Sequence, residues 1–220
     1  MVVDWIAVAR SWKRLEYIAK PAAMLALLAL LWVDSQGWGH WQPPLAWFAI
    51  GLVCCLAGDV LLMLPERYFL AGLVAFLLGH VAYTLGLNSA GWLWPTEVLL
   101  VIPMVFIGGW LVWRIRASLK ATGRSKLLAP IALYAAVISL MVVSAVATLF
   151  RGAWPTYAAA LTTFGAILFF TSDSLLAWNR FVAPIAHGKM LVIVAYHLGQ
   201  WALILGVTRL VQVFPGILSS

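Results

Sequence analysis

Charged residues are scarce in this sequence. Asp, Glu, Lys and Arg make up 10% of the 220 residues, while hydrophobic residues make up 65%, against roughly 45–50% in soluble domains. A soluble fold of this length could not bury so many apolar runs, several of which approach or exceed the ~18 residues that cross a bilayer. The shortage of charge therefore excludes an ordinary soluble protein and predicts an integral, multi-pass membrane protein.

Cysteine is rare as well. The two cysteines, Cys54 and Cys55, are adjacent in an apolar run, which fits neither a disulfide framework nor a zinc site. We expect both to be packing residues and predict no metal and no cofactor. The net charge is +7, but no basic stripe interleaved with aromatic residues indicates nucleic acid. We expect no nucleic-acid partner and interpret the cations as loop charges that contact membrane lipids.

What the sequence does contain is a series of apolar runs separated by polar residues, proline and glycine. These runs predict transmembrane helices at residues 17–33, 45–64, 68–87, 96–113, 127–149, 156–178 and 189–211. No long linker or low-complexity segment divides them. We therefore predict an all-α fold, a polytopic transmembrane helical bundle of about seven helices, in which residues 1–220 form a single domain.

Lys and Arg are distributed unevenly between the two ends of these spans. One end receives only Arg151 and Arg209, and the other receives twelve cations. The twelve are Arg10, Lys13, Arg14, Lys20, Arg67, Arg114, Arg116, Lys120, Arg124, Lys126, Arg180 and Lys189. Because cytoplasmic loops retain positive charge during insertion, the count predicts an N-in/C-out topology. We expect the protein in the bacterial inner membrane.

Two aspartates lie inside the apolar spans, where ionisable side chains are costly and indicate function. Asp59 and Asp173 each precede the predicted cytoplasmic end of a helix by about five residues, which places both roughly 8 Å below the same interface. Matching depth is what two carboxylates in one site require. The alternative is that each acid only neutralises a nearby cation or is solvated at the membrane edge.

Other polar residues in the spans allow two interpretations. His80 is either a structural histidine that bonds across helices or a catalytic one. Tyr196 and Gln200 share one face of the last helix, a pattern that an inward structural face also produces. The ammonium of Lys20 could reach Asp59 or a lipid phosphate, or it could extend to the headgroups.

Taken in order, the motifs resemble those of one family. They are Lys20-Pro21, Gly58-Asp59-x-Leu-Leu, Gly79-His80-x-x-Tyr83, Ser172-Asp173 and Tyr196-x-x-Gly199-Gln200, and they resemble the YhhN-like lysoplasmalogenase family from about residue 15 onward. Members of that family are multi-pass membrane hydrolases that cleave the vinyl ether bond of lysoplasmalogens, releasing a fatty aldehyde and a glycerophospho-base. The family pattern usually has eight helices, whereas the segment before Lys20 looks too short and too charged for a complete extra span.

The resemblance implies an enzyme that acts on a lysophospholipid, a 1-alkenyl-glycerophosphocholine or -ethanolamine. Vinyl ethers hydrolyse by protonation of the alkenyl carbon, followed by capture of an oxocarbenium ion by water, so the enzyme needs an acid and a nearby negative charge. Two carboxylates in a low-dielectric pocket can divide these roles. The predicted catalytic residues are Asp59, Asp173 and His80, and the predicted substrate-binding residues are Lys20, Tyr83, Tyr196 and Gln200. Which acid donates the proton stays open.

Two other functions remain alternatives. A small transporter or lipid-translocating protein would use paired acids for proton coupling, although the outer half of the spans is mainly apolar or aromatic. A metal-dependent hydrolase of the ceramidase kind would use His80, His197 and an aspartate, but these histidines lack a tight metal-ligand spacing. For the hydrolase, we expect the active site toward the cytoplasmic leaflet.

Overall fold

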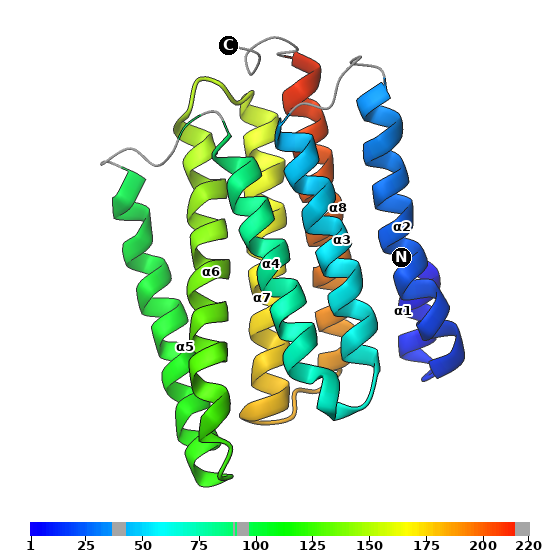
Figure 1. The fold of residues 1–220 in the computed structure, drawn as a ribbon, viewed down its shortest axis with the longest axis vertical. Helices are drawn as coiled ribbons and strands as arrows, with labels where there is room; N and C mark the ends of the chain where they lie inside the picture. The colour runs from blue at the N-terminus through cyan, green and yellow to red at the C-terminus, as the bar shows by residue number, and fades with distance from the viewer. Residues whose placement is uncertain (37–42, 90, 92–96, 214–220) are drawn as a thin grey trace.

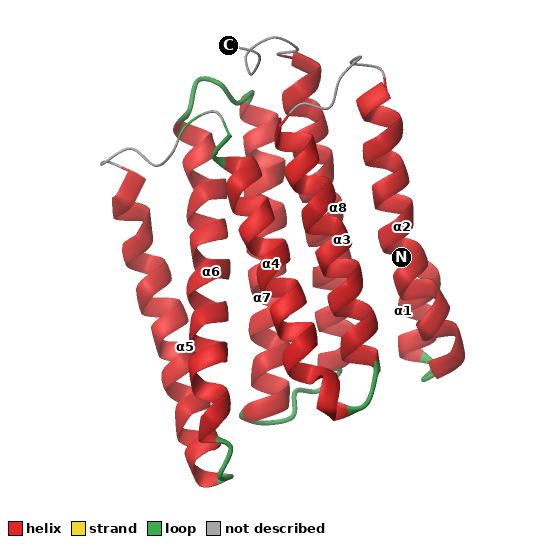
Figure 2. Cartoon of the chain, viewed as in Figure 1, coloured by secondary structure: helices red, strands yellow, loops and turns green. Residues whose placement is uncertain are grey.

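The computed structural model describes residues 1–36, 43–89, 91 and 97–213 of the chain. Within these residues all the regular structure is helical, as the colouring of Figure 2 shows. The α-helices are α1 (Val2–Ala9), α2 (Lys13–Gln36), α3 (Pro43–Met63), α4 (Phe69–Leu87), α5 (Val101–Ala121), α6 (Leu128–Ala147), α7 (Thr156–Phe181) and α8 (Gly188–Val213). Short 3₁₀ turns are η1 (Glu66–Tyr68), η2 (Glu97–Leu100), η3 (Ser125–Leu127) and η4 (Thr148–Phe150).

Seven of the described helices are long and apolar enough to cross a membrane. These are α2 to α8, and each agrees with one of the predicted spans. Helix α1 has only 8 residues, far fewer than the ~20 that a spanning helix needs. The prediction of an all-α, polytopic bundle of about seven transmembrane helices is confirmed.

Some helix boundaries differ from the predicted ones. Helix α2 begins at Lys13 instead of residue 17, so Pro21 lies inside the helix and not at its start. Helix α5 continues to Ala121 and α7 to Phe181, past the predicted ends at 113 and 178. The additional turns carry polar and basic residues out of the apolar layer, so hydropathy alone does not mark where these helices end.

Successive transmembrane helices run antiparallel, and their connections alternate between the two ends of the bundle (Figure 1). The start of α2 and the α3–α4, α5–α6 and α7–α8 connections lie at the lower end of the view, and the C-terminal end of α8 lies at the upper end. The lower end carries the twelve cations counted above, and we call it the basic end. That the basic end faces the cytoplasm stays a prediction from the charge count.

Glycines bring α3 against α4 and α7 against α8 at close range. A carbon added at Gly51 would lie 2.3 Å from the Tyr83 ring, and one added at Gly165 would lie 2.7 Å from the carbonyl oxygen of Gly199 and 2.7 Å from the amide nitrogen of Leu203. Small residues are typical of membrane helix interfaces, where association depends on close packing of the backbones. These contacts position the helices that carry both aspartates.

Replacing Gly165 with Ala should destabilise the protein by about 1–3 kcal/mol, because the new methyl group would meet backbone atoms that cannot rotate away. The measurement is the melting temperature in detergent. Gly109→Ala in α5 is the matched control, since a carbon added there meets nothing within 4 Å. A Gly165 variant that melts at the same temperature as the Gly109 variant would contradict the close packing of α7 and α8.

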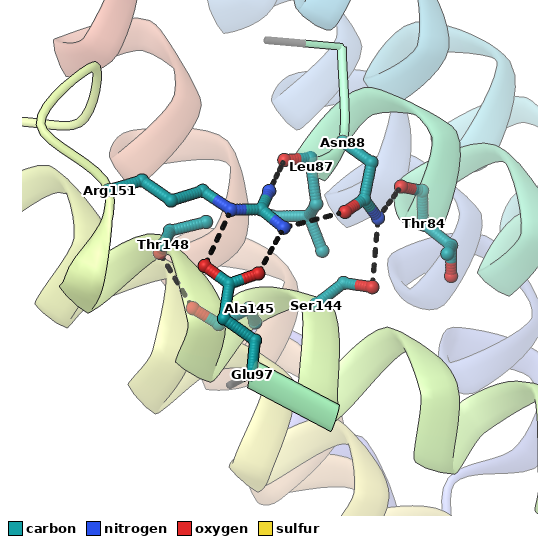
Figure 3. A network of polar contacts seen from close by, with 8 residues as sticks. All are labelled: Thr84, Leu87, Asn88, Glu97, Ser144, Ala145, Thr148 and Arg151. Carbon is teal, nitrogen blue, oxygen red and sulfur yellow. Dashed lines mark hydrogen bonds and ion pairs between the residues drawn. The ribbon is translucent and has the colours of Figure 1, made fainter. Parts of the chain in front are cut away.

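A buried ion pair ties helices together at the end opposite the basic end (Figure 3). Arg151 donates to both carboxylate oxygens of Glu97, at 3.2 and 3.0 Å, and the two side chains are only 7% and 6% exposed. The same guanidinium donates to the Leu87 carbonyl at 3.2 Å and to the Asn88 side-chain oxygen at 3.1 Å. Asn88 then donates to Ser144 at 2.8 Å. The sequence presents Arg151 as a loop charge, whereas the structure gives it a structural role.

Candidate functional site

A cavity of about 370 Å³ lies in the half of the bundle nearer the basic end. Its walls come from α2 to α8, with Val8 of α1 at one side. Asp59 of α3 and Asp173 of α7 both line it. The structure therefore brings the two acids to a common cavity, as their matching depth predicts.

Asp59 is almost completely buried, at 1% exposure, and has an ion-pair partner and a hydrogen-bond donor. The Lys20 Nζ lies 2.8 Å from Oδ1, and the Tyr196 hydroxyl donates to Oδ2 at 2.7 Å. Lys20 reaches this acid instead of extending to the headgroups, because a carboxylate removed from water needs a partner of opposite charge. Tyr196 lines the cavity as well, so this prediction from the sequence agrees with the geometry.

Asp173 is more accessible, with its side chain 15% exposed, and its neighbours come from α4 and α6. The Tyr134 hydroxyl donates to Oδ2 of Asp173. The fully buried His80 places Nε2 2.8 Å from the Tyr134 oxygen and 3.3 Å from the same carboxylate oxygen. Three side chains from three helices thus form one polar cluster around the second acid.

Aromatic rings fill the space around these two acid clusters. Phe76 packs edge-on against Tyr196, with ring centroids 6.0 Å apart, and Phe169 packs edge-on against His80 at 4.6 Å. Phe169 also meets Tyr196 at 5.3 Å. These rings remove water from the surroundings of the acids, and electrostatic interactions in such a low-dielectric environment are stronger than in water.

Tyr83 and Gln200 do not reach the cavity. Their side chains are fully buried and bond to each other, with the Tyr83 hydroxyl donating to the Gln200 carbonyl oxygen at 2.7 Å. Neither belongs to the cavity lining. Their bond joins α4 to α8, which fits the inward structural face that the sequence left open, and substrate contact by either residue stays a prediction.

The cavity has a basic mouth and an apolar interior. Lys13, Arg180 and Lys189 contribute to the lining, together with Glu16, which lies 2.9 Å from the Lys189 ammonium. The apolar part of the lining includes Leu73, Leu111, Val112, Ile115, Ile131 and Ile138. A molecule with one hydrocarbon chain and an anionic head has the polarity that such a cavity accepts.

The two candidate metal-ligating histidines lie in different environments. His80 contacts Asp173, whereas His197 accepts a bond from the Trp5 indole at 3.0 Å and lies 3.8 Å from Asp4. In the part of the chain that the structure describes, no three His, Cys, Asp or Glu side chains are grouped as metal ligands. The arrangement therefore does not support the ceramidase-like ligand set of His80, His197 and an aspartate.

Asp4 of α1 is a fully buried acid next to this site. Burial raises its pKa from 3.8 to about 6. The nearby Lys20 ammonium and the N-terminal ammonium oppose this shift, while the Glu16 and Asp59 carboxylates add to it. Because the pKa is higher in the folded state than in an exposed aspartate, folding favours the protonated form of Asp4.

The unfolding free energy should consequently fall as the pH rises through the interval from 3.8 to about 6. A shift of this size corresponds to about 3 kcal/mol at most. Asp4→Asn removes the titration, so we expect the variant to melt at a higher temperature than the original protein at pH 8 and at nearly the same temperature at pH 4. Melting curves in detergent at both pH values test this, and identical pH dependence of the two proteins would contradict it.

Tyr134 is the site residue that the sequence does not single out. It lies in an apolar helix without a recognisable motif, and one tyrosine in such a helix indicates nothing about its partners. Its position becomes informative only when α6 is packed beside α4 and α7 (Figure 1). The signal that the sequence offers for Tyr134 is its depth in the membrane, which is close to that of the two acids.

Comparisons with known proteins agree with this picture. Lysoplasmalogenase TMEM86B of Homo sapiens is 25% identical over 192 residues, covering 87% of this chain and 75% of that protein. The Sus scrofa protein of the same name is 29% identical over 201 residues, covering 90% and 77%. No solved structure matches. The YhhN family model matches residues 15–207, and the chain therefore belongs to the YhhN family.

Proposed function

We propose that this protein is a hydrolase that cleaves the vinyl ether bond of lysoplasmalogens. The relatives named lysoplasmalogenase support the activity. The observation that carries the chemistry is that Asp59 and Asp173, held by different partners, line one cavity with a basic mouth and an apolar interior. Two carboxylates in unlike surroundings are able to take different protonation states and hence different roles.

In the proposed reaction, a carboxylic acid donates its proton to the alkenyl carbon that is not bonded to oxygen. The double bond is consumed, and positive charge develops on the ether carbon and oxygen, where the second carboxylate stabilises it. Water then adds to the ether carbon and gives up a proton to a carboxylate. The product of this addition is a hemiacetal. The hemiacetal hydroxyl then loses its proton to a carboxylate while the glycerol oxygen gains one, and the C–O bond breaks to give a fatty aldehyde and a glycerophospho-base, so one water is consumed and no net proton.

The cavity suggests how the substrate would lie. We place the alkenyl chain among the apolar residues of α5 and α6, such as Leu111 and Ile131, and the headgroup at the basic mouth. Lys20 is engaged with Asp59 and Lys189 with Glu16, so we assign the phosphate contact to Lys13, which also lines the cavity. Lys and phosphate pair as point charges. The substrate would enter from the cytoplasmic leaflet of the inner membrane, an orientation supported by the excess of cations at the basic end.

The test is to incubate purified protein in detergent with an alkenyl lysophospholipid and with the matched ester and saturated ether analogues. Mass spectrometry should find a fatty aldehyde and a glycerophospho-base from the alkenyl substrate alone. Fatty acid from the ester would instead identify a lysophospholipase. Uptake of substrate by proteoliposomes without product would identify a transporter, and loss of activity with a chelator that zinc restores would identify a metal-dependent hydrolase.

A further inference from the structure

The hydroxyl of Tyr134 lies between the imidazole of His80 and the carboxyl group of Asp173. Its oxygen is 2.8 Å from Nε2 of His80, and its proton is directed to Oδ2 of Asp173. Each of the three residues belongs to a different helix, α4, α6 or α7. His80 is fully buried, and Tyr134 and Asp173 are partly buried, so the bonds among the three side chains limit where their protons can lie.

The proton positions follow from the number of donors that each group possesses. Tyrosine has one hydroxyl proton, and Tyr134 donates it to Asp173. The Tyr134 oxygen therefore accepts from Nε2 of His80, which must carry a hydrogen. The other ring nitrogen of His80, Nδ1, is buried without a partner, so a proton there would be an unsatisfied donor. We assign His80 as the neutral imidazole protonated on Nε2.

This assignment leaves one oxygen of Asp173 for catalysis. Oδ2 faces the Tyr134 hydroxyl and also lies 3.3 Å from the Nε2–H of His80. A proton on Oδ2 would oppose both donors. Oδ1 has no partner within the described residues, and the Asp173 side chain lines the cavity. The protonated form of Asp173 therefore carries its hydrogen on Oδ1, the oxygen left free for a bound molecule.

Asp59 has the opposite surroundings. The Lys20 ammonium forms an ion pair with its Oδ1 at 2.8 Å, and the Tyr196 hydroxyl donates to its Oδ2, so a cation lies against one oxygen and a hydroxyl donor against the other. This arrangement stabilises the ionised carboxylate. Asp59 is suited to stabilising positive charge, whereas Asp173 has a free oxygen and no cation bonded to it among the described residues.

On the basis of the function proposed above, we infer that Tyr134 is a positioning residue. Together with His80, it holds the transferable proton on Oδ1 of Asp173 and so fixes the direction from which this proton reaches the alkenyl carbon. Asp173 is then the proton donor and Asp59 the carboxylate that stabilises the oxocarbenium ion. A proton delivered from a fixed oxygen arrives at one face of the double bond. The reaction is consequently stereospecific at the carbon that becomes C2 of the aldehyde.

To test this, the reaction is run in D₂O, so that the alkenyl carbon receives a deuteron and becomes a CHD carbon. The aldehyde is reduced at once to the alcohol, and the configuration of the CHD carbon is determined. The original protein should give one enantiomer. Tyr134→Phe removes only the hydroxyl, so we expect kcat to fall about 10–100-fold, KM to change less than threefold, and the product to become a mixture of both enantiomers. Tyr157→Phe is the matched control, because Tyr157 is exposed and lies outside the cavity lining; it should behave as the original protein.

A Tyr134→Phe protein with unchanged kcat that still forms a single enantiomer would overturn the positioning role while leaving the hydrolase intact. Absence of aldehyde from the original protein would instead overturn the proposed function itself. A second pair of variants keeps the test independent of the folding of Tyr134→Phe. His80→Gln retains an N–H donor and should keep more stereospecificity than His80→Leu, which retains none; equal and complete stereospecificity in both would also overturn the inference.

Discussion

Replacing Asp173 with Asn should lower vinyl ether hydrolysis at least about 10³-fold, within the range of 10²–10⁴ that a general acid contributes. Asparagine has nearly the same shape as aspartic acid, but its amide cannot deliver a proton to carbon. The bond from Tyr134 to Oδ2 can be kept by the amide oxygen, so the protein should fold normally. Aldehyde release by purified variant, quantified by mass spectrometry, measures the effect.

Asp59→Asn should also abolish most of the activity, for a different reason. The substitution removes the negative charge that stabilises the oxocarbenium ion, and it leaves the Lys20 ammonium without the carboxylate that lies 2.8 Å away. A cation deprived of its partner in a mostly buried position destabilises the fold. The double variant Lys20→Met/Asp59→Asn should therefore recover melting temperature without recovering activity.

Asp34→Asn is the control for both acids, because Asp34 lies near the far end of α2 and outside the cavity lining. It should retain the activity of the original protein. Full activity in both Asp59→Asn and Asp173→Asn would contradict carboxylate catalysis and would leave the membrane fold untouched. Loss in only one of the two would restrict the chemistry to that acid.

The membrane fold is predictable from the sequence for a simple physical reason. Each span must satisfy its backbone hydrogen bonds internally, so every apolar run of sufficient length becomes a helix. Depth is predictable too, because a fixed rise per residue places Asp59 and Asp173 near the same level. Depth and helix direction made a shared site possible, and only the packing of the helices brings both acids to one cavity.

Which way each side chain points was not predictable. In helices α3, α4 and α8 the polar residues are not gathered on one continuous face, so the sequence does not distinguish the lipid side from the protein side. Gln200 and Tyr196 share a helix face, yet Tyr196 reaches the cavity and Gln200 bonds Tyr83. Tyr134 was missed for the same reason. Its meaning depends on neighbours from other helices, which a single sequence does not specify.

Arg151→Met should destabilise the protein by about 3–5 kcal/mol, the usual cost of breaking a buried ion pair by removing one member. The guanidinium connects Glu97 to the Leu87 carbonyl and the Asn88 side chain, so its loss leaves several acceptors unsatisfied where three helices end (Figure 3). Thermal unfolding in detergent measures the change. The double variant Arg151→Met/Glu97→Gln removes the buried carboxylate charge that Arg151 no longer neutralises and should recover part of the stability.

Arg116→Met, at an exposed position of α5 near the basic end, is the control and should melt within a degree or two of the original protein, as expected for surface charges. The Arg151 network lies beside the C-terminal ends of α4 and α6, at the end of the bundle away from the cavity (Figure 1). The kcat of Arg151→Met, measured well below its melting temperature, should therefore equal that of the original protein. A large loss of kcat in a folded Arg151 variant would mean that the two ends are coupled. An unchanged melting temperature would mean that the ion pair contributes nothing to holding α4, α5 and α6 together.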